Sequence, residues 1–205
     1  MGNNNIALLP PEFDPSLEAL LPVLSGKVPL IVTVHRASDI LTILHLADEF
    51  HVRIILSQAT EGYKVAGEIA KRKVPVIVGP LTQPPGILEM AGARMDNAAI
   101  LARRGVKLAF MTGSAHNVRN LPVEAGLAVA YGLPYDTALR ALTLSPAEIF
   151  GIGRFIGSLT PGKDADLVIW EGDPLEPTTR VHKVFINGKE IPLKSHQTEL
   201  FNQFK

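Results

Sequence analysis

The sequence contains no cysteine, which excludes disulfides, thiolate metal sites and thiol nucleophiles from this chain. It also lacks net charge at neutral pH, with 20 basic and 20 acidic residues. Such a balance gives no electrostatic attraction to nucleic acid or to anionic lipid. No apolar run approaches the roughly 18 residues that span a bilayer. We therefore expect neither a nucleic-acid partner nor a membrane partner.

Targeting and phosphate-binding signals are scarce as well. The opening residues, MGNNNIALLPPEFDP, lack the basic region and apolar core of a signal peptide. The glycines are scattered as turn residues and form no phosphate-binding loop. Because a chain without cysteine suits any redox environment, the localisation stays unknown.

The composition is that of a folded protein, and a small β unit is predicted near its C-terminal end. With 46% hydrophobic and 20% charged residues, the 205 residues are globular in composition. Within residues 157–190, Pro161 and Gly162 mark a turn, and the runs at 166–170 and 181–186 are rich in β-forming residues. Asn187-Gly188 then predicts a two-residue hairpin turn, because both residues tolerate a positive φ. Strands this short cannot bury their own faces and need another layer.

The same stretch carries a resemblance to a known family. The segments GSLTPGKDADLVIWEGDPL and VFINGKEI resemble the C-terminal segment of the amidohydrolase superfamily, in its imidazolonepropionase-like and prolidase-like branch. The resemblance implies a metal-dependent (β/α)8 barrel with a small β domain. It covers about residues 27–190 and only the C-terminal half of such an enzyme.

The region before the β unit alternates between strand and helix patterns. Four apolar runs, VPLIVTV, RIILS, VPVIVGP and VKLAFMT, are typical of strands buried on both faces of a parallel sheet. Helical spacing follows the first three runs, at 38–50, 60–71 and 96–104. We expect an α/β fold: half of a (β/α)8 TIM-type barrel, about four parallel βα units, followed by helices and the small C-terminal β unit.

The predicted domain organisation follows from these patterns. Residues 1–26 form an N-terminal extension with a short helix that begins at Asp14-Pro15, and residues 27–156 form the partial barrel. Residues 157–195 form the small β domain, and residues 196–205 form a tail helix. Within the barrel, Ser145 is the expected N-cap of a helix that carries Glu148 at its third position. A half barrel has two open sheet edges, so we expect a homodimer or a complementary barrel half as partner.

The expected site lies at the C-terminal ends of the strands, where barrel enzymes place their catalytic groups. The resemblance implies a His at the ends of the fifth and sixth barrel strands, an Asp at the eighth, and one or two divalent metals such as zinc. In this sequence these positions fall on Thr33, on Gln58, and on Gly113 or Ser114. The family's His-x-His pair and its fourth-strand Lys have no counterpart here. Hydroxyl and amide groups replace imidazole and carboxylate poorly as transition-metal ligands.

Two histidines remain near the expected mouth, and they are the candidate catalytic or metal-binding residues. His35 follows the first predicted strand and His116 follows the last. The alternative is that both are loop histidines, since catalytic zinc usually takes three protein ligands. Arg119 is a candidate for binding a substrate carboxylate, with Thr33 and Gln58 as further substrate-binding candidates. The alternative for Arg119 is that it fixes the loop.

Two functions are consistent with these observations. The first is an amidohydrolase-like hydrolase of C–N or ester bonds in small substrates, with another polypeptide segment supplying the missing half. The second is a catalytically inactive scaffold that acts as a binding or assembly module, with a small-molecule ligand or a partner chain. The substituted ligand positions favour the second.

Overall fold

A computed structural model describes residues 13–205, so the predicted features of residues 1–12 lie outside it. Four parallel strands form one sheet in the order β1 (Leu30–Val34), β2 (Ile54–Gln58), β3 (Val76–Val78) and β4 (Leu108–Phe110). Each of the first three strands pairs in parallel register with the strand that follows it in sequence. The expected run of four βα units is therefore confirmed.

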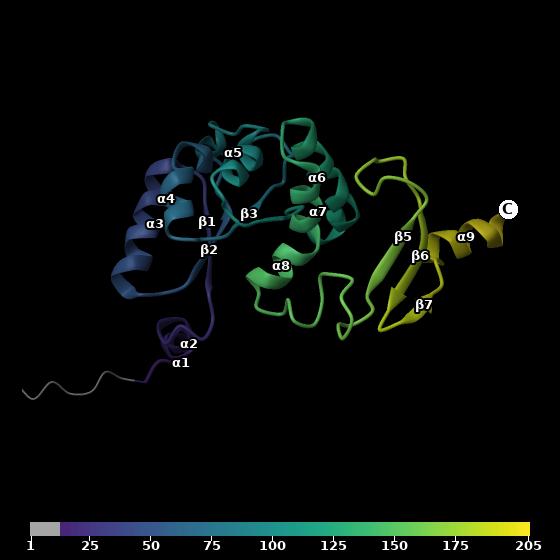
Figure 1. Ribbon diagram of the computed structural model, residues 1–205, viewed down its shortest axis with the longest axis horizontal. Helices are drawn as coiled ribbons and strands as arrows, with labels where there is room; N and C mark the ends of the chain where they lie inside the picture. The colour runs from purple at the N-terminus through teal and green to yellow at the C-terminus, as the bar shows by residue number, and fades with distance from the viewer. Residues whose placement is uncertain (1–12) are drawn as a thin grey trace, which may run out of the picture.

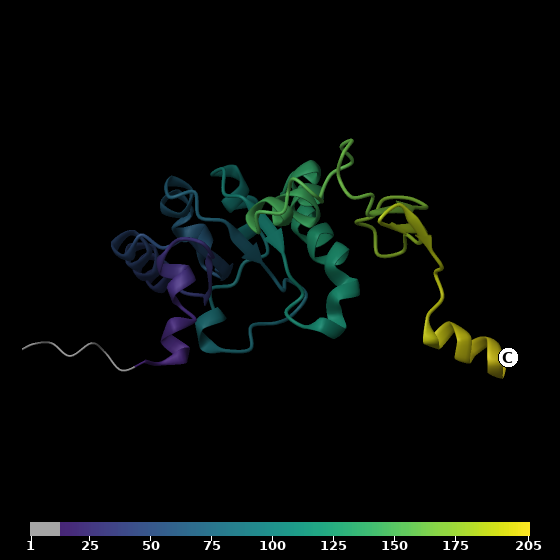
Figure 2. The same cartoon turned by 90° about the horizontal axis from the view of Figure 1, so that it is seen from below.

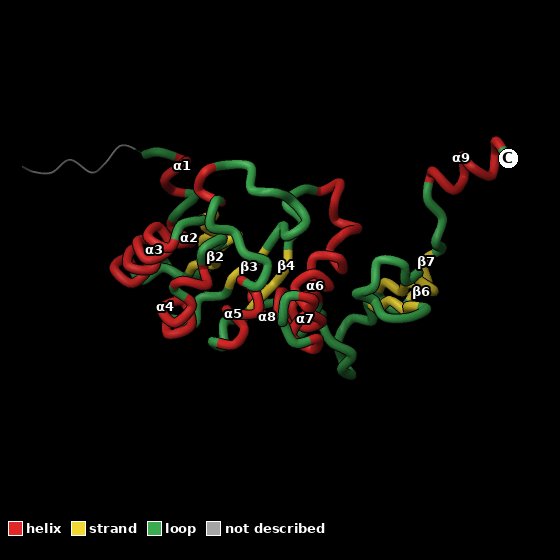
Figure 3. The backbone as a smooth tube through the Cα atoms, turned by 90° about the horizontal axis from the view of Figure 1, so that it is seen from above, coloured by secondary structure: helices red, strands yellow, loops and turns green. Residues whose placement is uncertain are grey.

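Helices cover one face of this sheet. The helices α3 (Ala37–Phe50), α4 (Ala66–Lys71) and α5 (Asn97–Arg103) follow the first three strands and form an arc along the strands in Figure 3. Their apolar side chains pack against the outward-facing residues of the strands, because both would otherwise expose carbon to water. The centre of this core is fully buried and includes Leu44, Leu56, Ile69, Val76 and Leu101.

The opposite face of the sheet, which would line the interior of a closed barrel, is less covered. Three helices follow β4: α6 (Leu121–Ala130), α7 (Tyr135–Leu142) and α8 (Leu144–Ile149). From α8, Ile149 packs with Ile55 and Ala109 and with the partly buried Ile77. This small cluster leaves β1 out, and Ile31 remains 51% exposed.

The small β unit is a three-stranded antiparallel sheet of β5 (Leu167–Trp170), β6 (Val181–Ile186) and β7 (Lys189–Ile191). The predicted hairpin turn is confirmed, since Asn187 and Gly188 have φ values of 50° and 73°. Asp166 accepts a hydrogen bond of 2.8 Å from the Asn187 amide, which fixes the turn. The unit lies beyond α6 and α7, away from α3, and carries the tail helix α9 (His196–Phe204) (Figures 1 and 2).

The N-terminal helix prediction is correct at its start and wrong in its extent. Asp14 accepts a hydrogen bond from the Ser16 amide and caps α1 (Pro15–Glu18). The single predicted helix is instead two short ones, because α2 (Leu21–Leu24) begins anew with Pro22 in its first turn. A proline is compatible with a first turn but not with a helix interior. Within residues 13–205, no helix combines the length and the apolar character needed to cross a membrane.

Two further helix starts differ from the prediction. The helix expected from residue 60 begins at Ala66, after a 3-10 turn η1 (Gly62–Lys64). The chain turns sharply after β2 instead, through left-handed backbone at Gln58 and Ala59. Ser145, the expected N-cap, lies inside α8, whose N-cap is Thr143. Glu148 is bound to Lys107 at 2.8 Å instead of closing a capping box.

Candidate functional site

The first mouth residue, His35, is held by the segment that follows β2. Its Nδ1 lies 2.8 Å from Thr60 Oγ1, and its carbonyl accepts a hydrogen bond from the Glu61 amide. The Glu61 carboxylate accepts from the Ala37 amide at 3.0 Å and from Lys64 at 2.5 Å. The bond from Lys64, and then the bond from Ala37, hold the pKa of Glu61 below its ordinary value. An ionised carboxylate therefore ties the ends of β1 and β2 together.

The other histidine, His116, lies on the 3-10 helix η3 (Ala115–Asn120), which follows β4. Its side chain is exposed, and its Nε2 lies 3.5 Å from Ser114 Oγ. Arg119 is exposed on the same turn, and Thr33 is exposed on β1 opposite Ser57. His116 and His35 thus have separate hydrogen-bonding surroundings.

The described part of the chain holds no group of three or more His, Asp or Glu residues placed to bind a metal ion. The strand ends carry Thr33, Gln58 and Gly113 where the resemblance implies metal ligands. A catalytic zinc site needs about three protein ligands of the imidazole, carboxylate or thiolate type. Residues 13–205 therefore do not fit such a centre by themselves.

The mouth does contain two buried amide oxygens. Gln58 Oε1, at the end of β2, and Asn97 Oδ1, at the start of α5, have no hydrogen-bond partner among residues 13–205. The Asn97 amide nitrogen donates to the Ala59 carbonyl at 3.0 Å, and its oxygen lies beside Gly62. Gln58 and Ala59 have φ values of 69° and 43°, a region that costs a non-glycine residue about 1–3 kcal/mol and that recurs at ligand-binding sites.

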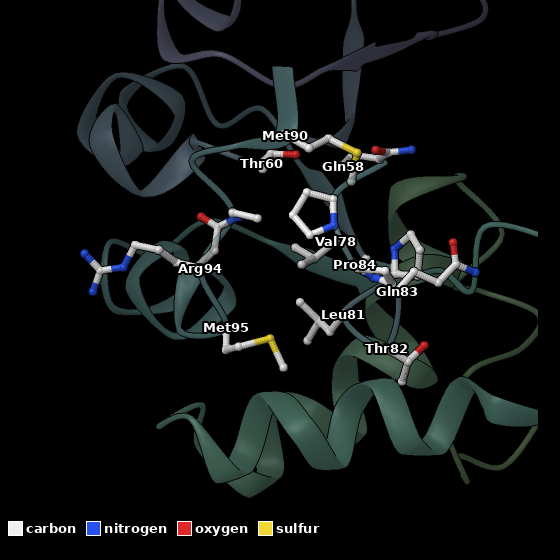
Figure 4. A pocket seen from close by; sticks show the side chains of 15 residues that line it. Gln58, Thr60, Val78, Leu81, Thr82, Gln83, Pro84, Met90, Arg94 and Met95 are labelled. Atoms are coloured by element: carbon white, nitrogen blue, oxygen red, sulfur yellow. The ribbon is translucent and has the colours of Figure 1, made fainter. Parts of the chain in front are cut away.

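Gln58 and Asn97 are also among the residues that line a cavity of about 300 Å³, although the two unpaired amide oxygens themselves are buried beneath its surface. The cavity lies over the ends of β2 and β3 and below the loop of residues 81–95, which contains the short 3-10 helix η2 (Leu88–Met90). Figure 4 shows Val78, Leu81 and Met95 around it, with the Arg94 side chain directed outward. The lining residues are Gln58, Thr60, Val78, Gly79, Pro80, Leu81, Thr82, Gln83, Pro84, Pro85, Met90, Ala93, Arg94, Met95 and Asn97.

The roof of the cavity is anchored by Glu124, a residue that the sequence reasoning missed. Glu124 lies on α6 and is 0% exposed. Its carboxylate accepts hydrogen bonds from the Leu81 amide and the Thr82 hydroxyl. The signal was a single acidic residue within the apolar helix LPVEAGLAVA, because a buried carboxylate needs nearby donors. At the other end of the loop, Gly92 packs so closely on Glu61 that a Cβ there would displace the Glu61 carboxylate.

The architecture and the site define a class: half of a parallel α/β barrel whose mouth lies at the C-terminal strand ends, with a small β unit attached. The sequence model of the amidohydrolase family matches residues 32–191. The chain belongs to the amidohydrolase family, as the C-terminal segment predicts.

Individual relatives support this assignment and show how much of them the chain represents. An amidohydrolase structure from Thermotoga maritima is 38% identical, with a TM-score of 0.83 over 89% of this chain and 48% of that one. An adenosine deaminase from Xanthomonas campestris, solved with bound zinc, is 25% identical, with a TM-score of 0.62 over 86% of this chain and 49% of its own. Imidazolonepropionase from Sphingopyxis alaskensis is 31% identical over 99 residues, 45% of this chain and 24% of that protein.

The chain therefore spans about half the length of these solved relatives. Relatives in this family are hydrolases and deaminases, and one of them holds zinc. In the part of the chain that the structure describes, the three strand ends instead carry the neutral residues Thr33, Gln58 and Gly113.

Proposed function

We propose that this chain is one half of a two-part amidohydrolase-type barrel and serves as a binding and assembly module. Its partner is a complementary segment with the strands and helices of the other barrel half. The observation that carries the proposal is an apolar groove of about 280 Å³ beside β1. The groove has only apolar lining residues: Leu20, Val23, Leu24, Leu30, Val32, Ile43, Leu46, Ala47, Phe50, Val52 and Ile54.

The groove has the properties of an interface. Leu24 and Phe50 on its walls are each 57% exposed, and large contiguous apolar patches usually mark a contact surface. The β1 strand pairs with β2 on one side only, so its other side offers unpaired backbone groups to a further strand.

A complementary half explains this surface better than a second copy does. In the Thermotoga relative, the region matched to this chain is 48% of a longer chain. That relative thus holds a further half within the same chain, and we infer that the corresponding segment lies against the β1 side here.

A second candidate function, hydrolysis by the completed barrel, is favoured by His35. This imidazole stands at a strand end, and Thr60 orients its ring. It fits a residue that holds or moves a proton at the mouth. The donor set of residues 13–205 supplies no complete metal centre, so this function requires ligands from the complementary half.

Co-production of this chain with the remaining half of the Thermotoga amidohydrolase tests the proposal. We expect a soluble one-to-one complex by light scattering, lost when Leu24→Glu and Phe50→Glu are combined. Leu159→Glu is the matched control, because Leu159 is 85% exposed in the β unit. The proposal would be contradicted if this chain stayed a stable monomer and did not bind the added half. A symmetric dimer of this chain that does not bind the added half would contradict it as well.

Metal analysis of the purified complex separates the two functions. About one bound zinc ion per complex, together with amide or ester hydrolysis that Gln substitution of His35 lowers, would favour the hydrolase. A folded complex with less than about a tenth of an equivalent would favour the binding module.

A further inference from the structure

A further cavity lies at the opposite end of the main sheet, where the strands begin, and has a volume of about 680 Å³. This basal groove is bounded by residues that precede the strands, such as Pro29 and Arg53, and by Ile149 of α8. It shares no residue with the cavity under the loop of residues 81–95. We propose that the basal groove binds a small molecule that carries a phosphate group, with Arg53 and Lys73 as the residues that hold the phosphate.

The basal groove is locally positive, although the whole chain carries no net charge. Its charged lining residues are two ion pairs, Asp48–Arg72 and Lys107–Glu148, and two further cations, Arg53 and Lys73. Just outside the lining, Glu68 also binds Arg72 and Arg140 also approaches Glu148, and these two charges offset each other. The excess of two positive charges is what a phosphate monoester balances at neutral pH.

The two excess cations lie at the same end of neighbouring strands. Leu56 of β2 pairs with Val76 of β3, and Arg53 and Lys73 each precede their member of that pair by three positions. Within residues 13–205 neither cation forms an ion pair. Arg53 donates only a long hydrogen bond of 3.4 Å to the Gly26 carbonyl. A guanidinium offers a planar pair of donors to phosphate oxygens and an ammonium offers a point charge, so the two cations are available to one anion.

The backbone at Lys73 gives independent support, because α4 and α5 end in the same left-handed turn with different residues. In α5, Gly105 has a φ of 81° and its amide donates to the Ala102 carbonyl at 2.8 Å. In α4, Lys73 has a φ of 54° and its amide donates to the Ala70 carbonyl at 2.9 Å. Glycine is the usual residue in this turn, and strained non-glycine residues recur at functional sites. A lysine at this position fits a residue whose ammonium binds a ligand.

The helix ends beside the basal groove do not cancel its positive charge. The helices α3, α4 and α5 all end at this side of the sheet, and a helix C-terminus carries a partial negative charge. Lys71 and Arg103 lie in the last turns of α4 and α5. Arg72 lies at the last turn of α3 through its bond to Asp48. A cation therefore stands at the end of each of the three helices.

The remaining lining residues determine the rest of the ligand. Leu44, Val52, Val74 and Ile149 provide apolar surface beside the cations. Sites for small molecules usually measure about 300–1,000 Å³ and combine apolar walls with a few polar groups. The basal groove therefore fits a phosphate group attached to an apolar or ring-shaped body.

Calorimetric titration of the whole chain with phenyl phosphate in a phosphate-free buffer tests the proposal, with benzenesulfonate and benzyl alcohol as comparison probes. The three probes share a ring and carry about two, one and no negative charges. We expect saturable binding of phenyl phosphate at one site, at least about tenfold weaker binding of the other two probes, and weaker phenyl phosphate binding as salt is added. Absence of saturable phenyl phosphate binding would overturn the proposal, and so would equal binding of benzyl alcohol.

A pair of matched substitutions locates the binding. Lys73→Gly removes the ammonium and suits the left-handed turn, so it should weaken phenyl phosphate binding about tenfold without lowering the urea midpoint. Lys205→Gly makes the same change at the exposed last residue and should leave binding unchanged. Equal affinity of the Lys73→Gly variant and the unmodified chain would overturn the assignment of this groove.

Vesicles distinguish a lipid headgroup from a soluble phosphorylated molecule. Because the site is a groove and not a flat surface, we expect the chain to remain in solution when it is sedimented with vesicles of phosphatidylcholine and phosphatidate. Sedimentation with these vesicles that Lys73→Gly abolishes would overturn the assignment to a soluble ligand.

Discussion

The two edge strands of the main sheet share a parallel geometry and differ in their surroundings. All three residues of β4 are buried, and α6, α7 and α8 pack against this strand. On β1, Leu30 and Ile31 are 40% and 51% exposed. The chain's own C-terminal helices therefore cover the side chains of β4, whereas those of β1 remain more exposed, although each of the two strands pairs with a neighbour on one side only. Association of this chain is accordingly expected at β1 and the groove beside it.

The largest expected difference between the buried and the exposed part of the sheet comes from shortening an apolar side chain in each. Leu56 in β2 is 0% exposed, and Leu56→Ala should lower the free energy of unfolding by about 2–5 kcal/mol through lost burial and a residual cavity. Ile31→Ala on β1 should change it by no more than about 0.5 kcal/mol, as at other exposed positions. Urea unfolding of the isolated chain measures both. If Ile31→Ala lowered the free energy of unfolding as much as Leu56→Ala, the Ile31 side chain would already be buried in the isolated chain.

The buried parts of the sheet are also the parts that the sequence predicted best. The runs RIILS and VKLAFMT predict β2 and β4 because strands buried on both faces need continuous apolar residues. The start of α8 could not be predicted in the same way. There, Ser145 lies within the helix and Glu148 forms an ion pair with Lys107. Tertiary contacts therefore override a local capping signal.

The cavity was beyond sequence reasoning for a related reason. Its roof depends on Glu124 reaching Leu81, which lies 43 positions earlier, and no local pattern encodes that contact. The left-handed backbone of Gln58 and Ala59 is equally invisible, since neither residue type favours it. The position of Gln58 at a strand end was predictable from the resemblance, but the burial of its oxygen without a partner was not.

The contact of Glu124 with the loop of residues 81–95 provides a second test, on the side of the sheet that α6–α8 cover. Glu124→Met keeps the side-chain length and removes both acceptor oxygens, so the Leu81 amide and the Thr82 hydroxyl lose their partner. Buried donors left without an acceptor should cost about 1–3 kcal/mol of unfolding free energy.

Glu171→Met is the control for that substitution, because the Glu171 side chain is 56% exposed in the β unit. Hydrogen exchange should show that Glu124→Met increases exchange at Leu81 in the roof while β1 is unaffected. Exchange that rises equally in β1 and in the roof would indicate general destabilisation and would contradict a local anchoring role.

The smallest expected effect concerns the ion pair that joins α8 to the start of β4. Lys107 lies 2.8 Å from Glu148, and its hydrogen bond is the main cause that holds the pKa of Glu148 below the ordinary 4.5. A carboxyl whose pKa is lower in the folded state stabilises the fold above its unfolded pKa. That stabilisation disappears as the pH falls through the lower, folded value. Because both side chains are partly exposed, the contribution should stay below about 1 kcal/mol.

Lys107→Met removes the main cause of the lowered Glu148 pKa and keeps the apolar stem. We expect the variant to be slightly less stable at pH 7 and to lose less stability than the unmodified chain as the pH falls below 4.5, the ordinary pKa of Glu148. Urea midpoints across that range measure the difference. Lys183→Met, which removes the exposed pair with Glu190 in the β unit, is the control. If the two variants lost stability equally as the pH falls, the Lys107–Glu148 pair would stabilise the fold no more than the exposed Lys183–Glu190 pair does. The stability of the β4 edge would then come from burial under α6–α8 alone.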